Sequence, residues 1–474
     1  MNLKSKRFLS LQNLFELRRI HSVNERYASG RVFYHKQLLG LTDESGLIWP
    51  ICKNEFLKQI ELQEGDWIAF KCKIHKVTNH EQAQNENYLI VLTEIFEHVE
   101  NKSAWDNPKI VSPIPNKNDI NTSQLVLDNI YTLYQSSKTK KRFQLIQKRN
   151  KAIERTALFF KNKGFINIET PTLVPSGGIE VYLNPFATTY TDHRNKKWQL
   201  ELPTSPEFAL KKIMTEGVEK IFQLSRAYRN HGEVSRHHEP EFIMLEWYRA
   251  NSDLEKIMED TQKLVQLLSD LLGSTLEIPK QWPKFRIDDL FKKNLNLDLE
   301  KLQERDQFYT QAKHLSPSIT VNDDWDTLFY KLFMEKIEPF LLEQKACFVT
   351  HYPIQMGALA TQEKVQTAAG EIKLKPYVER MEAYLYGVEI CNGYFELNDA
   401  AILLDRFNKT KSFRKDLQTD SGFEKAMQFG LPTCSGNALG IDRVIATLLE
   451  LKEISLLFPI PFLSQFPTDS VAWE

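Results

Sequence analysis

The stretch RAYRNHGEVSRHHEPEFIMLEWYR, residues 226–249, places several basic side chains directly before an apolar pattern typical of a strand. Within that pattern Glu246 stands among apolar neighbours, and burying a carboxylate there is costly unless a cation meets it. Successive side chains of a strand point to opposite faces, so one face carries Phe242, Met244, Glu246 and Tyr248. The other face, with Leu245 and Trp247, is expected to point into a core.

The shared face suits two kinds of ligand. A flat aromatic ring such as Phe242 can stack on a purine, and Glu246 beside Tyr248 can bind an ammonium group. Upstream, Arg229 could grip a phosphate with its planar fork of donors. An edge strand with an ordinary salt bridge at Glu246 is the alternative, and the stretch alone leaves both open.

A second block, RMEAYLYGVEICNGYFEL (380–397), carries Glu382, Glu389 and Glu396 in an otherwise apolar and aromatic stretch. Magnesium prefers one or two carboxylates together with phosphate oxygens, so this pattern indicates a hard-cation site. Asn392, Tyr394 and Glu396 alternate onto one face and could line a polar pocket.

The third block, GLPTCSGNALGIDRVIATLLE (430–450), leads from a loop with Gly436 and Gly440 into an apolar helix. Glycines permit a close backbone approach, and Arg443 at the helix start could contact a phosphate. Taken alone this signal is weak, because many helices begin after a glycine.

Composition bounds the remaining possibilities. The chain has 474 residues, 42% hydrophobic content and a formal net charge of −1. Its overall charge therefore indicates neither a nucleic-acid nor a membrane partner. The five cysteines never form CxxC, which favours a reducing compartment without a zinc finger or a disulfide framework. No apolar run approaches transmembrane length, and we expect a cytoplasmic protein. Adjacent His237 and His238 would point to opposite faces of an extended segment, which disfavours a zinc site.

Three regions follow from the change in pattern along the chain. Residues 1–100 predict a helix (9–19) and short strands typical of an OB-like β-barrel. Its aromatic residues Trp67 and Phe70 could stack on nucleic acid or simply form the core. Residues 101–140 are predicted to be a linker, and residues 141–474 a catalytic domain of alternating helices and strands.

Within the third region, RFQLIQKRNKAIERTALFFKNKG (142–164) predicts a helix that stops at Gly164. FINIETPTLVP (165–175) should then be extended, since Pro171 prevents the helix from continuing. Residues 252–345 are expected to be mostly helical and to form an insertion between strand-bearing blocks. No internal repeat is found.

The first and third blocks, together with a segment at 161–173, resemble the three motifs of class II aminoacyl-tRNA synthetases. KNKGFINIETPTL resembles motif 1, RAYRN…EPEFIMLEWY motif 2 and GNALGIDR motif 3. LPTSPEFALKKIM (202–214), GVEICNGYFELNDA and LPTCSGNALGIDR are similar to the lysyl branch, and most closely to the family of ligases that attach (R)-β-lysine to elongation factor P. The resemblance covers roughly residues 141–465.

The resemblance implies an α+β fold: a class II catalytic domain with a largely antiparallel sheet flanked by helices, following the N-terminal barrel, and a homodimer formed through motif 1. It implies that Arg229 and Arg443 are catalytic and bind the phosphates of ATP, with Mg²⁺ held by Glu382 and Glu389. The implied ATP-binding residues are Arg229, Asn230, His231, Glu233, Phe242, Glu382, Glu389, Ile390, Gly440 and Arg443. The implied amino-acid site is Ser205, Glu207, Glu246, Tyr248, Asn392, Tyr394, Glu396 and Ala438.

On this resemblance the protein activates (R)-β-lysine or lysine as an adenylate and transfers it to a lysine of elongation factor P. Ala438 favours that outcome, because lysyl-tRNA synthetases usually have glycine there. Two features depart from the pattern: the N-terminal barrel is typical of tRNA-binding synthetases, and His231 follows Asn230 where the family usually has glutamate, which Glu233 could replace. The alternatives are therefore a lysyl-tRNA synthetase or paralogue that charges tRNA, and a catalytically silent regulatory paralogue.

Overall fold

The structure is a computed structural model in which two units are distinguished, residues 1–147 and 148–474. It describes the strands of the first unit and residues 138–465 without 181–182, 233, 358 and 368–369. The predicted helix at 9–19, most of the predicted linker and the predicted ATP ligand Glu233 lie outside the described residues.

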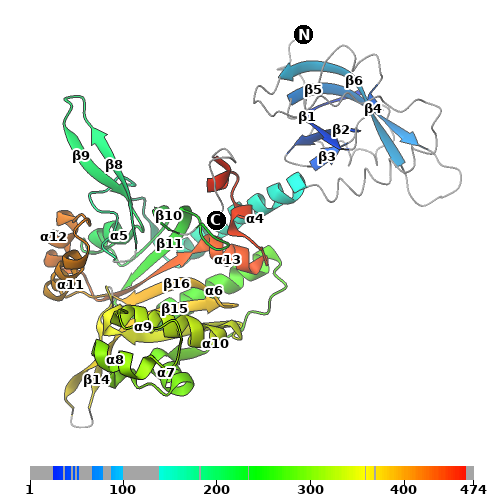
Figure 1. Ribbon diagram of the computed structural model, residues 1–474. Helices are drawn as coiled ribbons and strands as arrows, with labels where there is room; N and C mark the ends of the chain where they lie inside the picture. Colours follow the sequence, from blue (N-terminus) through cyan, green and yellow to red (C-terminus); the bar gives the residue numbers. More distant parts are fainter. Residues whose placement is uncertain are drawn as a thin grey trace. The chain divides into compact units, whose positions relative to one another are not determined.

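The first unit contains six described strands, which form one sheet in the order β3-β2-β1-β5-β6-β4 (Figure 1). Phe70 is buried in this unit together with Leu41, Ile68 and Leu92, so its ring belongs to the core. The OB-like barrel remains a prediction. The strands are β1 (Glu25–His35), β2 (Leu38–Asp43), β3 (Gly46–Ile48), β4 (Ile51–Cys52), β5 (Trp67–Val77) and β6 (Asn87–Val99).

The second unit is built on a mixed sheet of nine strands in the order β12-β13-β15-β16-β17-β11-β10-β7, with β14 paired to β15. All its pairings are antiparallel except β10 with β7 and β12 with β13. The strands are β7 (Ile166–Asn167), β10 (Lys220–Tyr228), β11 (Glu241–Ala250), β12 (Lys284–Arg286), β13 (Ala346–Pro353), β14 (Gln362–Gln366), β15 (Ile372–Leu385), β16 (Val388–Phe395) and β17 (Cys434–Gly440). This confirms the predicted class II catalytic fold.

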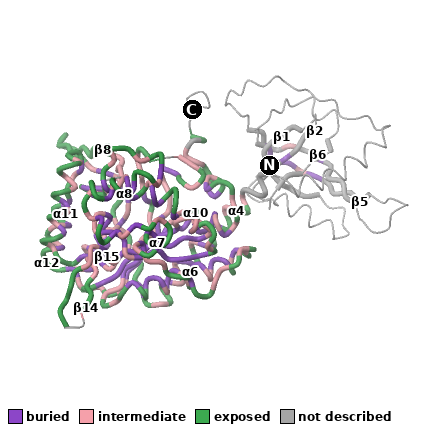
Figure 2. The backbone as a smooth tube through the Cα atoms, turned by 60° about the horizontal axis from the view of Figure 1, so that its bottom comes forward, coloured by how far each residue is buried: buried purple, intermediate pink, exposed green. Residues whose placement is uncertain are grey.

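Helices cover both faces of this sheet, and the purple core of Figure 2 follows its strands. On one face α4 (Lys138–Asn162), α6 (Leu254–Leu272) and α13 (Ile441–Leu448) pack on Leu245 and Trp247, which are fully buried as predicted. On the other face α5 (Glu207–Met214), α11 (Ala400–Phe413) and α12 (Ser421–Gly430) form a second apolar cluster with Ile221 and Tyr248. The two clusters show that β11 alternates as its sequence predicts.

Residues 252–345 are mostly helical, as expected, and their first helix is part of the central core. Helix α6 begins after Asp253, whose side chain accepts from the backbone N–H of Lys256, and ends at Gly273 in a left-handed conformation. The following helices pack around β13 and β15 in a third cluster. They are α7 (Ile287–Leu295), α8 (Arg305–Ala312), α9 (Trp325–Leu332) and α10 (Glu338–Leu342).

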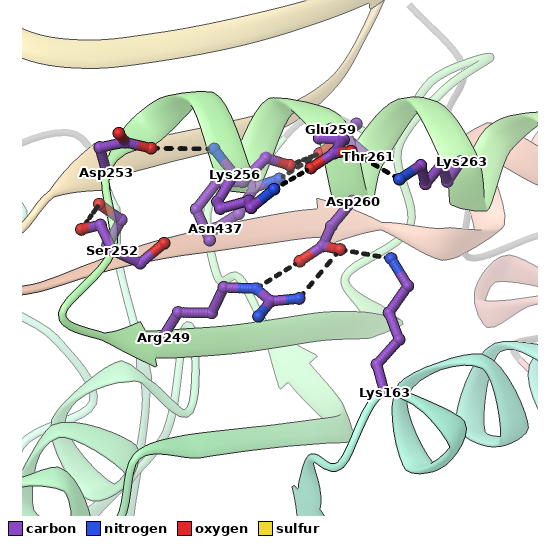
Figure 3. A network of polar contacts seen from close by, with 12 residues as sticks. Lys163, Arg249, Ser252, Asp253, Lys256, Glu259, Asp260, Thr261, Lys263 and Asn437 are labelled. Carbon is purple, nitrogen blue, oxygen red and sulfur yellow. Dashed lines mark hydrogen bonds and ion pairs between the residues drawn. The ribbon is translucent and has the colours of Figure 1, made fainter.

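A buried ionic network ties α4, β11 and α6 together (Figure 3). The carboxylate of Asp260 accepts two hydrogen bonds from the guanidinium of Arg249, at 2.7 and 3.1 Å, and one from Lys163 at 2.6 Å. Lys163 immediately precedes Gly164, whose φ of 79° ends the helical region as the sequence predicts. The network fixes the motif 1 helix against the strand that carries Glu246.

A two-stranded hairpin, β8 (Phe186–Thr191) and β9 (Lys197–Leu202), projects from the second unit (Figure 1). The rings of Tyr190 and Trp198 stack across it at 5.6 Å, and Lys196 lies over Trp198. The strand β9 leads directly into the segment that precedes α5. The hairpin is therefore connected along the chain to the segment that carries Ser205 and Glu207.

Candidate active site

The strand register gathers the predicted site residues into rows across the sheet. Glu246 of β11 pairs with Ala438 of β17, Ala438 with Asn392 of β16, and Asn392 with Glu382 of β15. Paired residues of adjacent strands share a face, so these four side chains lie on one face. The next row on that face contains Tyr248, Gly436, Tyr394 and Arg380. Strand β11, the hairpin of β15 and β16, and strand β17 thus contribute to one surface.

Three carboxylates meet at one end of these rows. The ammonium of Lys211 lies 2.6 Å from Oε1 of Glu207 and 2.6 Å from Oε2 of Glu396. Glu207 and Lys211 are one turn apart on α5, which places them on the same side of the helix. Burial and Glu207 raise the pKa of Glu396 to about 7, against the opposing attraction of Lys211. The sequence pattern did not single out Lys211.

Glu246 is the third carboxylate and is almost fully buried. It accepts a hydrogen bond from the Tyr248 hydroxyl at 3.3 Å and interacts with the Ser205 hydroxyl. Burial raises its pKa well above the usual range, and the nearby charge of Glu207 raises it further while Lys211 opposes this. In the same row, on the far side of Ala438, Oδ1 of Asn392 is buried without a hydrogen-bond partner among the described residues. A buried carboxylate and an unused acceptor on the same face favour a cationic donor as ligand.

Gly436 makes room for this cluster. A Cβ atom at this position would lie 2.3 Å from Cε1 of Tyr248 and 2.6 Å from Oε1 of Glu396. Both side chains are held by their own neighbours, so a methyl group could not be added without moving them. The glycine is required by close approach and not by its backbone conformation.

We expect Gly436→Ala to lower the free energy of unfolding by about 1–3 kcal/mol, because it overpacks a closely filled region. Denaturant unfolding monitored by tryptophan fluorescence measures the change. The matched control is Gly232→Ala, since the nearest atom to a Cβ there lies 3.5 Å away in ordinary contact. Equal stability of the two variants would contradict the packing around Gly436.

Two guanidinium groups define the other end of the site. Arg443 donates from Nη1 to the backbone carbonyl of Glu389 at 3.1 Å, and Arg229 lies 5.2 Å from the centroid of Phe242. Nε of Arg229 is buried and has no hydrogen-bond partner among the described residues. Burial lowers the pKa of Arg229 and the charge of Arg443 lowers it further, although Glu180, Glu389 and Glu246 oppose them. Two close guanidiniums with an unused donor are a site for an anion.

A buried ion pair sets the position of Arg443. The neighbouring Asp442 accepts from Nε and Nη2 of Arg149 at 2.6 and 3.2 Å, and from the backbone N–H of Ile243 at 3.0 Å. Arg149 lies on α4, Asp442 on α13 and Ile243 on β11. One carboxylate thereby holds together the helix that leads into the motif 1 segment, the strand of motif 2 and the helix of motif 3.

The loop between β10 and β11 contains the departure seen in the sequence. His231 has a φ of 52°, and its backbone N–H donates to Oδ1 of Asn230 at 2.9 Å. His238 hydrogen-bonds the Ser235 hydroxyl at 2.8 Å, and burial together with Arg443 and Arg229 lowers its pKa to about 4. His238 is therefore neutral at physiological pH beside the two arginines.

Glu382 and Glu389 occupy very different surroundings. Oε2 of Glu382 accepts from the hydroxyls of Tyr352 and Tyr384 at 2.6 and 2.7 Å, and Oε1 accepts from Arg380 at 2.6 Å. Burial raises the pKa of Glu389 to about 7, and the charge of Glu382 adds to this effect. Within residues 138–465, where the structure describes them, no cluster of three or more acidic, histidine or cysteine side chains is arranged to hold a metal.

The remaining predicted residues divide by the side of the sheet they face. The Ile390 side chain is buried in the core with α13, so that only its backbone is available to a ligand. Gly440 precedes α13, and a Cβ there would contact the Arg443 side chain. Tyr394 packs between two apolar clusters next to Arg380. Among the described helices, none combines the length and the apolar character that a bilayer span requires.

Sequence reasoning also missed Glu180. Solvent reaches its side chain, yet protein surrounds it so densely that burial raises its pKa. The charge of Glu207 adds to that rise, while Arg229 opposes it. Its interactions with Glu207 and with Arg229 place Glu180 within electrostatic reach of both the acidic end and the guanidinium end. A lone glutamate after GlyGlyIle offered no periodic signal that could have identified it.

Known proteins with the same pattern identify the family. The model of the class II tRNA synthetases of the D, K and N type matches residues 123–463. Three curated relatives are named elongation factor P–(R)-β-lysine ligase. The one from Buchnera aphidicola subsp. Schizaphis graminum is 33% identical over 326 residues, covering 67% of this chain and 95% of its own. Those from Hamiltonella defensa and Yersinia enterocolitica are each 32% identical, covering 66% and 64% of this chain and 94% and 90% of their own.

The match spans all three segments that Asp442 joins and both ends of the site. Its extent, together with the nearly complete coverage of the relatives, goes far beyond a shared motif. The chain therefore belongs to the class II tRNA synthetase family of the D, K and N type and is a ligase.

Proposed function

We propose that this protein activates (R)-β-lysine, or lysine, with ATP and transfers it to a lysine side chain of elongation factor P. The names of the relatives support the acceptor and the amino acid. The observation that carries the proposal is the convergence of Glu207, Glu246 and Glu396 at one end of a site whose other end holds Arg229 and Arg443.

The charge of the acidic end suits a diamine. Three carboxylates and the single ammonium of Lys211 leave two negative charges when all are ionised. In the empty pocket protons neutralise part of this charge, as the raised pKa values of Glu246 and Glu396 indicate. A substrate with two ammonium groups replaces those protons, and Oδ1 of Asn392 can accept an additional N–H.

The guanidinium end suits the phosphates of ATP, and Phe242 offers a ring for stacking on adenine. In the first step a carboxylate oxygen of the amino acid attacks the α-phosphorus. The new P–O bond forms as the bond to the bridging oxygen breaks, giving an aminoacyl adenylate and pyrophosphate. Arg229 and Arg443 would hold the phosphates and offset their charge, and no side chain needs to form a covalent bond.

Magnesium fits the pair Glu382 and Glu389. Glu389 has an elevated pKa of about 7 because it is buried near Glu382, and a divalent cation would relieve this repulsion. Bound there, the ion would neutralise phosphate charge. The hydroxyls of Tyr352 and Tyr384 and the guanidinium of Arg380 would keep the Glu382 carboxylate oriented.

In the second step the ε-amine of the acceptor lysine attacks the carbonyl of the adenylate. A C–N bond forms, AMP leaves with the bonding electron pair of the C–O bond, and the amine loses a proton. The product is an amide. With tRNA as acceptor, a terminal ribose hydroxyl would attack instead and give an ester.

Ala438 lies between Glu246 and Asn392 in the row that forms the floor of the pocket. We expect Ala438→Gly to shift the preference from (R)-β-lysine toward lysine by up to about 1–3 kcal/mol, because the missing methyl group leaves room next to the substrate carbons. The ratio of kcat/KM for the two amino acids in pyrophosphate exchange measures the shift. An unchanged ratio would show that the methyl group does not touch the substrate.

The function is tested in two stages. Amino-acid-dependent pyrophosphate exchange with lysine and (R)-β-lysine tests activation. Labelled amino acid is then offered to elongation factor P and to tRNA in separate reactions with the full chain. Label on elongation factor P alone is expected. Label on tRNA alone would overturn the proposed acceptor, and an absence of exchange would favour a catalytically silent paralogue.

Charging of tRNA is the second candidate, and one observation favours it. The family match begins at residue 123, so the six-stranded sheet of the first unit lies outside it. A separate N-terminal sheet domain is what a tRNA-binding synthetase would need. The transfer reaction with tRNA distinguishes this candidate directly.

A homodimer through motif 1 agrees with the surface near α4 and β7. Leu158, Ile166 and Leu173 are exposed by 46%, 54% and 52%, and Ile166 lies on the strand at the edge of the sheet. Exposed apolar residues beside an unpaired strand edge are suited to a second copy of the chain. Sedimentation equilibrium is expected to give twice the monomer mass, and a monomer at micromolar concentration would contradict this.

A further inference from the structure

Lys211 is a lysine with almost no solvent contact. Its side chain is 1% exposed, and its ammonium lies 2.6 Å from a carboxylate oxygen of Glu207 and 2.6 Å from one of Glu396. It also lies 6.0 Å from the centroid of the Tyr248 ring. A lysine is rarely buried to this extent unless its charge is fully compensated. Its two partners raise its pKa above the ordinary value despite burial, so it stays charged.

The depth of the three groups shows that Lys211 does not block the pocket. The side chains of Lys211 and Glu396 are each 1% exposed, whereas that of Glu207 is 12% exposed. Solvent therefore approaches from the side of Glu207, and Lys211 lies behind it. The other carboxylate oxygen of Glu396, Oε1, lies 2.6 Å from where a Cβ of residue 436 would be and so faces Gly436 rather than Lys211.

The third carboxylate has no such partner. Glu246 receives hydrogen bonds from Tyr248 and Ser205, but no ion pair to a cation is found for it among the described residues. The pocket thus has one primary ammonium built in, and it retains negative charge for the ligand. Whether a ligand with one, two or three positive charges fits best depends on this resident charge.

We propose that Lys211 is a specificity-determining positioning residue: its ammonium holds the carboxylates of Glu207 and Glu396 in place and sets at two the number of positive charges that the pocket accepts from a substrate. The inference rests on the proposed function, since it concerns the same amino-acid pocket. Lys211 acts through its two partners and does not itself touch the reacting atoms.

The first test compares Lys211→Met with Lys211→Arg in lysine-dependent pyrophosphate exchange. Methionine keeps most of the buried volume and removes the charge, so the KM for lysine is expected to rise on the order of a hundredfold while the KM for ATP stays unchanged. Arginine keeps the charge, so the affinity of Lys211→Arg for lysine is expected to be about a tenth of the wild-type affinity or more, read from its KM. An unchanged KM in a folded Lys211→Met protein would overturn the proposal.

The pH profile separates this role from a purely structural one. In the wild type the KM for lysine should rise as pH falls through about 7, where Glu396 takes up a proton. Without the neighbouring cation the carboxylates hold protons to higher pH, so this limb should move to higher pH in Lys211→Met. The groups facing Glu396 are Lys211 and Glu207 from α5, Glu246 and Tyr248 from β11, Tyr394 from β16 and Cys434 from β17.

Chemical rescue provides the decisive measurement. Lys211→Ala leaves a buried space in which n-propylammonium can replace the missing side chain and its charge. We expect this amine to lower the KM for lysine by about tenfold, and n-propanol at equal concentration to have no effect. Rescue by both compounds would mean that Lys211 only fills volume, and rescue by neither in a protein with a normal Tm would contradict the charge role.

Failure of the inference differs from failure of the proposed function. If the wild type shows no exchange with lysine or (R)-β-lysine, the proposed function is wrong and the variants are irrelevant to it. If the wild type exchanges normally and Lys211→Met matches it in KM and pH profile, only the role of Lys211 is overturned.

Discussion

Replacing Arg229 by alanine is expected to lower lysine-dependent pyrophosphate exchange on the order of a thousandfold. The reason is that its guanidinium is held inside the protein next to Arg443 with a buried, unused Nε donor, and it interacts with carboxylates only at longer range. Such a group stabilises the phosphates of ATP electrostatically once ATP has bound in the site. The loss should fall mainly on kcat, measured in exchange at saturating lysine and ATP.

Stability distinguishes this effect from misfolding. The pKa of Arg229 is lowered because burial and Arg443 disfavour its charged form in the folded state. Removing the charge should therefore leave Tm unchanged or raise it. Arg226→Ala is the matched control: Arg226 lies on β10, which ends just before Arg229, its side chain is 61% exposed and it forms a surface ion pair with Glu241, so activity should stay near that of the wild type. A large activity loss in both variants would contradict the assignment.

Glu246→Gln is expected to raise the KM for lysine on the order of a hundredfold or more, with little change in the KM for ATP. Glutamine keeps the shape and the contacts to Tyr248 and Ser205 but loses the charge that pairs with a substrate ammonium. Losing a charged partner in a buried pocket lowers the binding affinity more than losing a neutral hydrogen bond does. The split between the two KM values is read from exchange kinetics at varied lysine and ATP.

The same variant has a defined effect on stability against pH. Burial raises the folded-state pKa of Glu246 well above its unfolded value of about 4. A raised pKa of an acid means that ionisation disfavours the folded state once pH exceeds the unfolded value. The stability advantage of Glu246→Gln should be absent near pH 4, grow as pH rises and level off above the folded pKa. Thermal unfolding across this range measures it.

Glu241→Gln provides the control on the same strand. The Glu241 side chain is 42% exposed and forms an ion pair with Arg226 at the surface. Its replacement should alter neither KM nor the pH dependence of unfolding. A pH-independent difference between Glu246→Gln and the wild type would show that Glu246 has the same pKa in the folded and unfolded states, which would contradict the rise caused by burial.

Alternation along β11 was predictable from the sequence because the period of a strand is two. Leu245 and Trp247 reach the core under α6, and Glu246 and Tyr248 face the site, as that period requires. The resemblance to class II synthetases likewise identified the three segments in order. Helix α4 ends at Asn162, near the predicted stop at Gly164, because glycine accepts the left-handed conformation there.

The partners of these residues were not predictable in the same way. Arg149 and Asp442 are separated by 293 residues, and Tyr352 and Glu382 by 30, so no local period relates them. Lys211 stood in a quoted motif, yet its spacing from Glu207 fits an ordinary surface pair on a helix equally well. Only its distance to Glu396 and its burial show a different role.

The sequence by itself determined which side chains alternate, where helices stop and to which family the chain belongs, since these depend on neighbours along the chain. The tertiary structure decided which charges meet. Register across four strands set Glu246, Ala438, Asn392 and Glu382 in one row, and the packing of α5 against that sheet brought Lys211 between two carboxylates. Electrostatic interactions depend on distance in space, and that distance exists only once the sheet has formed.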